Sequence, residues 1–198
     1  MTNLKNEILA KSMSLFLLKS YNEVSIKEIQ VAVGCSRGVM YHHFESKKQI
    51  FEEVVKKYIL PAFSSFSNVA KEKRLTLRDA IDSSIAIRVR YIQSLKENNS
   101  NESVDFLFFK FLFQLGELYD GFSDIADNLQ CKETEAWKEV VLNAIKNGEI
   151  KEYLDADFVT QYFVSLPYGL GLLRAFAKGI NCEDIKDSYI KFYNLIRK

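Results

Sequence analysis

Apolar residues recur at three- and four-residue spacing along most of this chain. Two such stripes are Leu77, Ile81, Ile85, Val89 and Ile92, and Ile185, Tyr189, Phe192 and Ile196. This spacing gathers apolar side chains on one face of a helix, and no run alternates apolar and polar residues as a strand does. Because only two prolines and eight glycines interrupt it, the pattern predicts an all-α protein.

Capping residues and a glycine divide the N-terminal part into three expected helices. These cover about residues 4–19, 25–32 and 36–43. Ser25 followed by Glu28 forms a capping box that starts the second helix, Gly34 ends it, and Ser36 caps the third. Two short helices joined by a tight glycine turn form a helix-turn-helix, whose second helix is shaped to enter the major groove of DNA.

A long connecting helix is expected next. Ser46 with Gln49 forms a second capping box, and the helix runs from Phe51 to about Phe63, where Pro61 bends its end. Further helices are expected from Leu77 to an Asn-rich turn at 98–101, over Val104–Tyr119, around Trp137 up to Gly148, over Phe158 to about Lys178, and after Asn181. The caps of the last two are predicted to be Asp155 and Asn181.

We place a domain boundary near residue 50, inside the connecting helix, which gives domains of residues 1–50 and 51–198. The formal charge of the whole chain is only +1, but residues 1–60 hold nine Lys or Arg against six Asp or Glu, and the remainder holds 18 against 20. A net positive charge on the N-terminal part has the sign expected for a region that meets phosphates.

The cysteines and the apolar runs bear on location. Cys35, Cys131 and Cys182 are far apart and lack CxxC spacing, which favours reduced thiols over a disulfide framework or a zinc site. The most apolar runs, 106–115 and 163–173, fall short of the roughly 20 residues that a membrane-spanning helix needs, and the N-terminus lacks a signal-peptide pattern. We therefore expect a cytoplasmic protein without a membrane partner.

A set of residues between about 5 and 52 has a specific order and spacing. It comprises Ile8, Leu9, Leu15, Phe16, Tyr21, Ser25, Ile29, Gly34, Ser36, Gly38, Tyr41, His43, Phe44, Ser46 and Lys47. This segment resembles the DNA-binding domain of the TetR family of bacterial transcriptional regulators. The resemblance implies a three-helix DNA-binding domain, joined by the connecting helix to a larger helical domain that binds an effector and dimerises.

One face of the short third helix is predicted to read DNA. The predicted DNA-binding residues of the chain are Ser25, Ser36, Arg37, Gly38, Tyr41, His42 and Lys47. Arg37 can bind guanine O6 and N7, Gly38 lets the backbone approach the groove, and Tyr41 and His42 suit phosphate oxygens or a thymine methyl group. By 3.6-residue periodicity Met40 and Phe44 lie on the opposite face and anchor the helix.

Two helix starts offer phosphate sites. Lys47 stands at the start of the connecting helix, where free amides and the helix dipole favour an anion, and Ser25 offers a similar site. The resemblance places DNA contacts at Arg37, Tyr41 and Lys47. The alternative is that Tyr41, His42 and His43 are ordinary surface or half-buried residues, which we favour for His43.

The chain departs from the family pattern at four positions, Ser20, Gln30, Val33 and Val39. The family's threonine at position 39 touches the DNA backbone, so Val39 puts one phosphate contact in doubt. Gln30 adds a polar group that is a candidate for a new contact.

The resemblance implies that residues past about 52 bind a small effector. The density of aromatic residues suggests an apolar pocket for a lipophilic or aromatic compound. The candidate ligand-binding residues are Arg88, Phe108, Phe111, Tyr119, Trp137 and Tyr162. Alternatively, each of these aromatic residues fills the core, and Arg88 meets a nearby carboxylate in place of an acidic ligand.

Dimerisation through the last two helices is also implied by the resemblance. The candidate interface residues are Leu166, Gly169, Leu170, Leu173, Tyr189, Phe192 and Ile196. Two helices from each of two subunits would form a four-helix bundle. The alternative is an intramolecular core, and we favour the homodimer because a palindromic operator requires two helix-turn-helix units.

These features predict a ligand-responsive transcriptional regulator, most simply a repressor released from a palindromic double-stranded DNA operator by a small effector. An enzyme is not expected, because two adjacent histidines and no nucleophile–base or metal-ligand grouping offer no catalytic site; we expect no metal and no cofactor. The alternative is a helical ligand-binding or interaction module that no longer binds DNA specifically, which the near-neutral charge supports.

Overall fold

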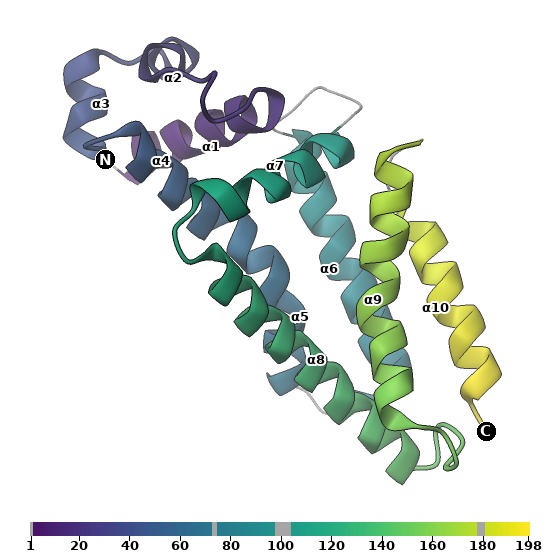
Figure 1. Ribbon diagram of the computed structural model, residues 1–198. Coiled ribbons are helices and arrows are strands. Elements are labelled where there is room, and N and C mark those ends of the chain that lie inside the picture. The colour runs from purple at the N-terminus through teal and green to yellow at the C-terminus, as the bar shows by residue number, and fades with distance from the viewer. Residues whose placement is uncertain (1, 73–74, 98–103, 178–180) are drawn as a thin grey trace. The chain divides into compact units, whose positions relative to one another are not determined.

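The computed structural model describes residues 2–72, 75–97, 104–177 and 181–198 (Figure 1). Every named element in these ranges is a helix, which confirms the all-α prediction; an isolated bridge joins Ile150 and Arg197. The elements are α1 (Thr2–Leu18), α2 (Ile26–Val33), α3 (Arg37–His43), α4 (Lys47–Val54), the π-helix η1 (Val55–Ile59), α5 (Leu60–Glu72), α6 (Leu77–Glu97), α7 (Val104–Leu118), α8 (Phe122–Lys146), α9 (Ala156–Ala175) and α10 (Cys182–Ile196). None of the helices in the described ranges is long and apolar enough to cross a membrane.

The caps predicted for α2, α3, α9 and α10 form as expected. Ser25 and Ser36 cap α2 and α3, and Gly34 ends α2 with a φ of 74°, a left-handed conformation that glycine adopts without strain. Asp155 and Asn181 cap α9 and α10 through their side chains. The Asn-rich turn at 98–101 and the predicted helix end at Lys178 lie outside the described residues.

The connecting helix is longer than predicted. Helical structure continues from Lys47 through η1 to Glu72, whereas the sequence pattern suggested an end near Phe63. The π turn directly precedes Pro61: the amide of Leu60 donates to Val55, one residue further back than in an α-helix. Pro61 has no amide hydrogen to donate, so the wider turn lets the chain pass the proline without ending the helix.

The chain forms two compact units. One comprises Met1–Pro61 and Ser94–Asp120, and the other Ala62–Gln93 and Gly121–Lys198. The first unit therefore includes α7 together with the helix-turn-helix. The functional boundary near residue 50 stays a prediction.

An aromatic core holds the first unit together. Helix α1 packs against α2, α4 and α7. The ring of Phe51 lies 5.4 Å from that of Phe16 and 5.7 Å from that of Phe111, measured between centroids. Since Phe16, Phe51 and Phe111 are almost fully buried, α7 shares the core against which the helix-turn-helix packs.

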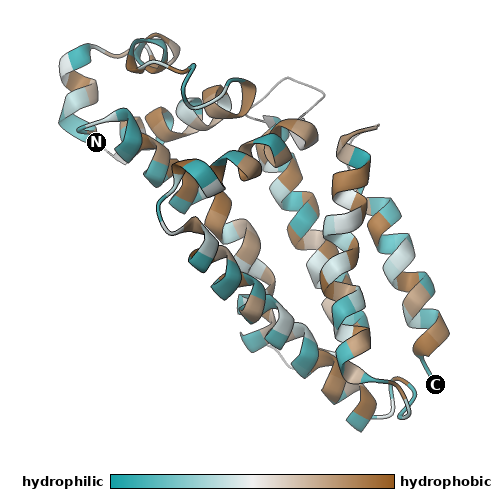
Figure 2. Cartoon of the chain, in the orientation of Figure 1, coloured by the Kyte–Doolittle hydropathy of each residue, from teal (hydrophilic) through white to brown (hydrophobic). Residues whose placement is uncertain are grey.

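The second unit is built around Trp137 of α8. Its indole stacks on Phe66 of α5 at 4.3 Å and on Phe163 of α9 at 5.0 Å. Helix α9 packs between α8 and α10, and the buried Tyr189 hydroxyl donates to the Phe163 carbonyl. Figure 2 shows hydrophobic and hydrophilic residues alternating around these helices, as expected where each buries one face.

Candidate nucleic-acid interface and ligand pocket

Helix α3 presents one polar face to solvent. Arg37, Gly38, Tyr41 and His42 are exposed, and His43 is half-buried. On the opposite face the side chains of Met40 and Phe44 are 1% and 2% exposed. The four exposed residues that the sequence assigned to DNA therefore share a surface, and DNA contact by them stays a prediction.

The side chains on this face are partly ordered by one another. The Arg37 guanidinium lies 5.5 Å from the centroid of the Tyr41 ring, a cation–π contact. Ser36 accepts a hydrogen bond from the Val39 amide at 3.4 Å, which fixes the first turn of α3. A cation held above a surface ring at a helix N-terminus is a geometry suited to a base edge or a phosphate.

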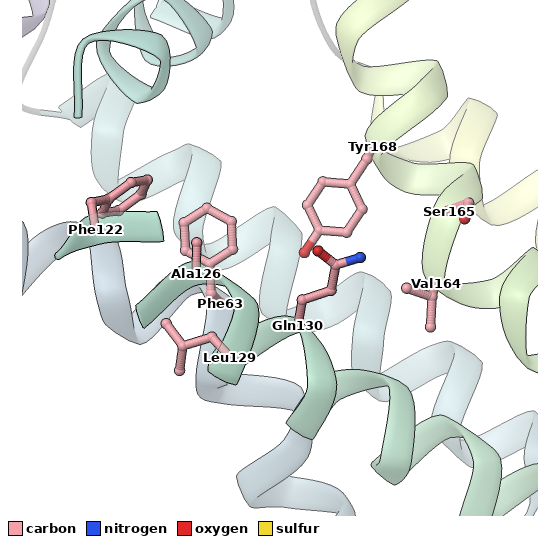
Figure 3. Close-up of a pocket in the computed structure, with 8 residues that line it drawn as sticks. All are labelled: Phe63, Phe122, Ala126, Leu129, Gln130, Val164, Ser165 and Tyr168. Atoms are coloured by element: carbon pink, nitrogen blue, oxygen red, sulfur yellow. The ribbon is translucent and has the colours of Figure 1, made fainter. Parts of the chain in front are cut away.

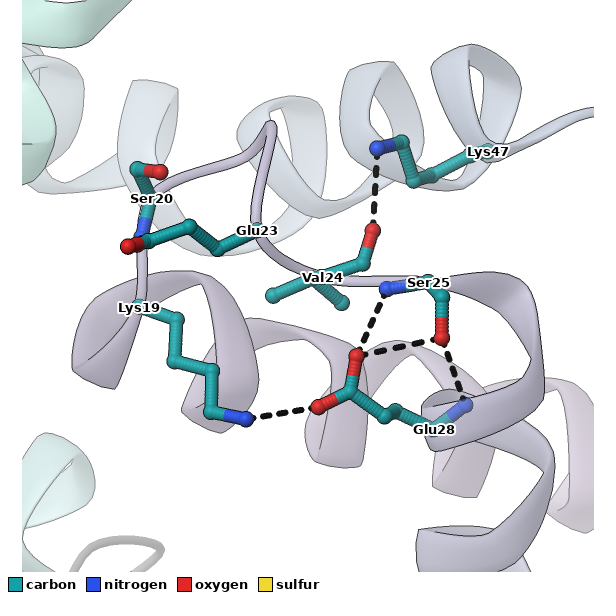
Figure 4. Close-up of polar contacts among 7 residues, drawn as sticks. All are labelled: Lys19, Ser20, Glu23, Val24, Ser25, Glu28 and Lys47. Carbon is teal, nitrogen blue, oxygen red and sulfur yellow. Dashed lines mark hydrogen bonds and ion pairs between the residues drawn. The ribbon is translucent and has the colours of Figure 1, made fainter.

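Ser25 takes part in a compact polar cluster at the start of α2 (Figure 4). Its hydroxyl accepts from the Glu28 amide at 3.2 Å, and its own amide donates to the Glu28 carboxylate at 2.9 Å, which confirms the capping box. Lys19 donates to the other carboxylate oxygen at 2.6 Å. This ammonium, with the amide and hydroxyl of Ser25, lowers the pKa of Glu28 to about 2.

Lys47 ties the turn before α2 to the start of α4. Its ammonium donates to the carbonyls of Tyr21 and Val24, both at 2.9 Å, and lies 4.2 Å from the centroid of the Tyr21 ring. Figure 4 shows the Lys47 side chain reaching to Val24, next to Ser25. The Lys47 side chain therefore links the two predicted phosphate sites, Lys47 and Ser25, through the turn before α2.

The second capping box is only half formed. Ser46 accepts from the Gln49 amide at 3.1 Å, but the Gln49 side chain accepts from the Glu45 amide at 2.6 Å in place of the Ser46 amide. Gln30 also differs from expectation: its amide nitrogen is buried and has no hydrogen-bond partner among the described residues. In this position it does not offer the phosphate contact that the sequence suggested.

Helix α7 touches the same region of the first unit. The Tyr21 amide donates to the side-chain Oε1 of Gln114 at 3.4 Å, and Lys48 of α4 pairs with Asp120, just after α7, at 2.7 Å. Lys48 lowers the pKa of the Asp120 carboxyl, and Asp120 raises that of Lys48. Tyr21 and Lys48 are therefore held by α7 and by the turn that follows it.

The second unit contains a cavity of about 340 Å³ (Figure 3). It is lined by residues of α5, α8 and α9: Phe63, Phe122, Ala126, Leu129, Gln130, Val164, Ser165 and Tyr168. Its volume lies within the range of small-molecule sites. None of the six residues that the sequence proposed for the ligand lines it.

Those six residues lie elsewhere. Phe111 is 1% exposed and packs on Phe51 in the first unit. Phe108 and Tyr119 belong to that same unit. Trp137 is the fully buried centre of the second unit, and Tyr162 stacks on Phe192 at 3.8 Å. Phe111 and Trp137 fill the core, the alternative that the sequence left open, whereas Phe108, Tyr119 and Tyr162 are half-buried. The helical pattern alone does not show which side of a helix faces a cavity.

Arg88 is paired with a carboxylate of its own chain, the alternative that the sequence left open. Its Nη2 atom lies 3.4 Å from Oε1 of Glu133, which is a buried residue. The Tyr168 hydroxyl donates to Oε2 of Glu133 at 2.8 Å. Burial, with the nearby carboxylate, raises the pKa of Tyr168, so its hydroxyl keeps the proton that it donates.

The seven proposed dimer residues divide between α9 and α10, and Phe192 of α10 is half-buried and stacks on Tyr162 at 3.8 Å. Leu166, Gly169, Leu170 and Leu173 follow one another along α9, and Leu173 is 69% exposed. Tyr189 and Ile196 are 0% and 4% exposed, because they fill the core of their own chain. These two residues therefore offer no surface to a second copy, which corrects their assignment; the interface itself stays a prediction.

Three exposed apolar residues extend the α9 face beyond what the sequence assigned. Phe158, Phe176 and Leu195 are each at least 66% exposed. Phe158 and Phe176 continue the helical spacing of Leu173 on α9, and Leu195 lies on α10. Counting by the 3.6-residue helical period from Leu173 would have placed Phe158 and Phe176 on the same face.

The comparisons with known proteins agree with this architecture. Residues 8–54 match the family model described as bacterial regulatory proteins, tetR family. The transcriptional repressor KstR2 of Rhodococcus jostii is 21% identical over 168 residues, which span 80% of this chain and 73% of that protein. The negative transcriptional regulator IcaR of Staphylococcus aureus is 26% identical over 119 residues, which span 59% of this chain and 50% of that protein.

A solved structure shows the same fold over the full length. A transcriptional regulator from Saccharomonospora viridis, in complex with choline, covers 100% of both chains with a TM-score of 0.72 and 18% identity. The matched family model and these curated relatives indicate a transcriptional regulator. This chain thus matches the TetR family over residues 8–54, which confirms the resemblance stated from the sequence. Its relatives are regulators and not enzymes, in agreement with the sequence analysis.

Proposed function

We propose that this regulator is a repressor that binds a palindromic operator as a homodimer and is released by a small lipophilic or aromatic effector. The observation that carries the DNA-binding role is the single exposed face of α3, formed by Arg37, Gly38, Tyr41 and His42 on a helix anchored by buried residues. Such a face can enter the major groove, while the charge of Arg37 is available to a guanine edge.

Gly38 supports close approach to DNA. A Cβ atom added at Gly38 would meet no other atom of the protein within 4 Å. The fold therefore does not require glycine there, although glycine weakens a helix relative to alanine. A bound duplex supplies a reason for the absent side chain, since the backbone at this position can then approach the base edges.

Lys47 supports a phosphate contact beside this face. An ammonium group has three donors, and two of those of Lys47 bind the carbonyls of Tyr21 and Val24. The third is available to a phosphate oxygen, and the free amides of the first turn of α4 lie at the same helix end.

The exposed stripe on α9 supports the homodimer. Phe158, Leu173 and Phe176 are 66%, 69% and 70% exposed. Gly169 is exposed, and no atom lies within 4 Å of an added Cβ. Large apolar groups beside a small residue are typical of helices that pack closely against a partner, and a second copy would bury them.

The cavity supports an effector, and chain connectivity supports its coupling to DNA binding. Phe122 lines the cavity, and Asp120, two residues earlier, pairs with Lys48 beside the phosphate-binding candidate Lys47. Between them Gly121 has a φ of 74°. A ligand that moves Phe122 would act on α7 and on the turn at Tyr21. The related regulator solved with choline supports a small-molecule role for this fold.

Gly38→Ala tests the DNA-binding role. Labelled duplexes from the promoter of the protein's own gene would be titrated with the wild type, with Gly38→Ala and with Gly116→Ala, whose added methyl also meets no protein atom. Both substitutions are expected to leave the fold intact or stabilise it by up to about 1 kcal/mol. Only Gly38→Ala is expected to lose operator affinity; equal affinity of both variants would contradict DNA reading by α3.

A further inference from the structure

The cavity of the second unit has one apolar end and one polar end. Figure 3 shows Phe63, Phe122, Ala126 and Leu129 at one side, and at the other the polar Gln130, Ser165 and Tyr168 together with Val164. Gln130 and Ser165 are exposed, so the polar end is where the cavity opens to solvent. A ligand that fits this shape has an apolar or aromatic body and a polar group at one end.

Tyr168 fixes the kind of polar group. Its hydroxyl has one hydrogen and two acceptor lone pairs, and the hydrogen is already donated to Glu133 at 2.8 Å. Arg88 also donates to this hydroxyl, so what the Tyr168 oxygen offers to the cavity is the remaining acceptor lone pair. A ligand hydroxyl or amide N–H can donate to it, and the Gln130 amide at the same end can donate to or accept from the same ligand group.

The charges behind Tyr168 cancel. The Glu133 carboxylate binds Tyr168 through one oxygen and lies 3.4 Å from Arg88 through the other. The Arg88 guanidinium also lies 5.5 Å from the centroid of the Tyr168 ring. None of the eight residues described around the cavity is charged. An ionic ligand would lose its hydration there without meeting an unpaired opposite charge.

From these contacts we propose, building on the effector role above, that the cavity takes an uncharged compound with an aromatic or alicyclic body and one hydroxyl or amide group that donates to the Tyr168 oxygen. Tyr168 is the residue that determines specificity. Glu133 and Arg88 are positioning residues. Glu133 accepts the hydrogen bond of the Tyr168 hydroxyl, and Arg88 balances the Glu133 charge, so that no net charge attracts an ion.

A matched set of probes tests the charge selectivity. Full-length protein is titrated calorimetrically with 2-naphthalenemethanol, 2-naphthoate and 2-naphthylmethylammonium, which share one ring system and are neutral, anionic and cationic at about pH 7.5. The alcohol is expected to bind at least about tenfold more tightly than either ion. An ion that binds as tightly as the alcohol overturns the inference and leaves the effector role standing. Absence of binding by all three overturns both, whereas the DNA-binding role is judged separately by the duplex titrations.

Two variants test the roles of the residues. Tyr168→Phe is expected to weaken the alcohol about three- to tenfold and to leave its methyl ether, which has no donor, unchanged. The control is Tyr162→Phe, which removes a hydroxyl that binds the Ser188 carbonyl and does not line the cavity. An equal loss for alcohol and ether in Tyr168→Phe contradicts the donor assignment.

Glu133→Gln separates positioning from a merely structural effect. It leaves the Arg88 charge unopposed, so the affinity of 2-naphthoate relative to the alcohol is expected to rise. General destabilisation would weaken all probes alike, and unfolding curves show whether the variant is folded. An unchanged ratio of the two affinities in the folded variant contradicts the role of the Arg88–Glu133 pair.

Discussion

The charged groups of Lys47 and Arg37 are fixed in place by different contacts, although both residues are candidates for DNA contact. The Lys47 ammonium is bound to the Tyr21 and Val24 carbonyls, whereas the Arg37 guanidinium rests on the exposed ring of Tyr41. An ammonium group fixed to backbone carbonyls is suited to a phosphate contact, which is the same for every DNA sequence. A fork of donors on a solvent-facing ring is suited to reading a base edge.

Substitution of each residue should therefore change binding differently. Arg37→Ala is expected to cost about 1–3 kcal/mol on operator DNA with little effect on random DNA. Lys47→Ala is expected to weaken both and to reduce the slope of log affinity against log salt by about one. Titrations of operator and random duplexes over a salt series measure both effects.

The structural role of Lys47 requires a control. Because its ammonium also fixes the turn before α2, thermal unfolding of Lys47→Ala should accompany the titrations, with Lys11→Ala as an exposed lysine of α1 for comparison. If Arg37→Ala loses the same affinity on random DNA as on the operator, its assignment to base reading is wrong.

At the scale of whole elements, the start of α6 depends on a residue far along the chain. The amides of Leu77 and Arg78 donate to the Glu149 carboxylate at 2.9 and 3.1 Å, and Tyr193 of α10 donates to it at 3.1 Å. Glu149 thus satisfies two free amides at the N-terminus of α6 and links it to α10, and its negative charge is favourable at that helix end.

Glu149→Ala is expected to destabilise the protein by about 1–3 kcal/mol, because these donors lose a charged acceptor. Urea unfolding followed by circular dichroism measures the change. Glu152→Ala, an exposed carboxylate in the same connection, should change the stability by less than about 0.5 kcal/mol. Similar losses in both variants would show that Glu149 acts through general charge and not through its hydrogen bonds.

The elements also show which features a sequence can predict. Ser25, Gly34 and Ser36 act on amides within a few residues, so their roles follow from spacing alone. Contacts such as Glu149 with Leu77 or Gln114 with Tyr21 join distant segments, and no local pattern indicates them.

The same limit applies to the candidate sites. The stripe that contains Tyr189 has the same period whether it meets a second copy or its own chain, and only the packing of α9 and α10 shows that Tyr189 is internal. The exposed face of α3 could be predicted from the sequence, because the two anchors Met40 and Phe44 fix which face is buried. The cavity could not be predicted from the sequence, because its lining comes from three helices.

For the whole molecule, the α9 stripe predicts the state of assembly. Leu173→Glu places a charge on a residue that is 69% exposed in the single chain, so it should fold normally but give particles near the 22.9 kDa chain mass in light scattering. Leu142→Glu is the matched control, since Leu142 is 48% exposed on α8. Loss of the dimer in both variants, or a wild type that is monomeric at every concentration, contradicts the proposed interface.

Effector and operator should also influence each other equally. If the effector lowers operator affinity through a coupling of about 1–3 kcal/mol, roughly 5- to 150-fold, the operator must lower effector affinity by the same factor. The effect arises only from differential affinity of the ligand for two arrangements of the protein. Calorimetric titration of 2-naphthalenemethanol with and without operator DNA measures it, and identical affinities would exclude such coupling for this compound.

Trp137, the single tryptophan of the chain, gives the protein an optical property of its own. Its indole is stacked between Phe66 and Phe163, is fully buried, and has no hydrogen-bond partner for its N–H among the described residues. Ultraviolet emission from this one fluorophore should therefore lie at short wavelength, as for indole in a hydrocarbon solvent, and shift to the red when water enters. Since Phe63 and Val164, which line the cavity, are close in the chain to the two stacking rings, the emission reports on the interior of the second unit without any added label.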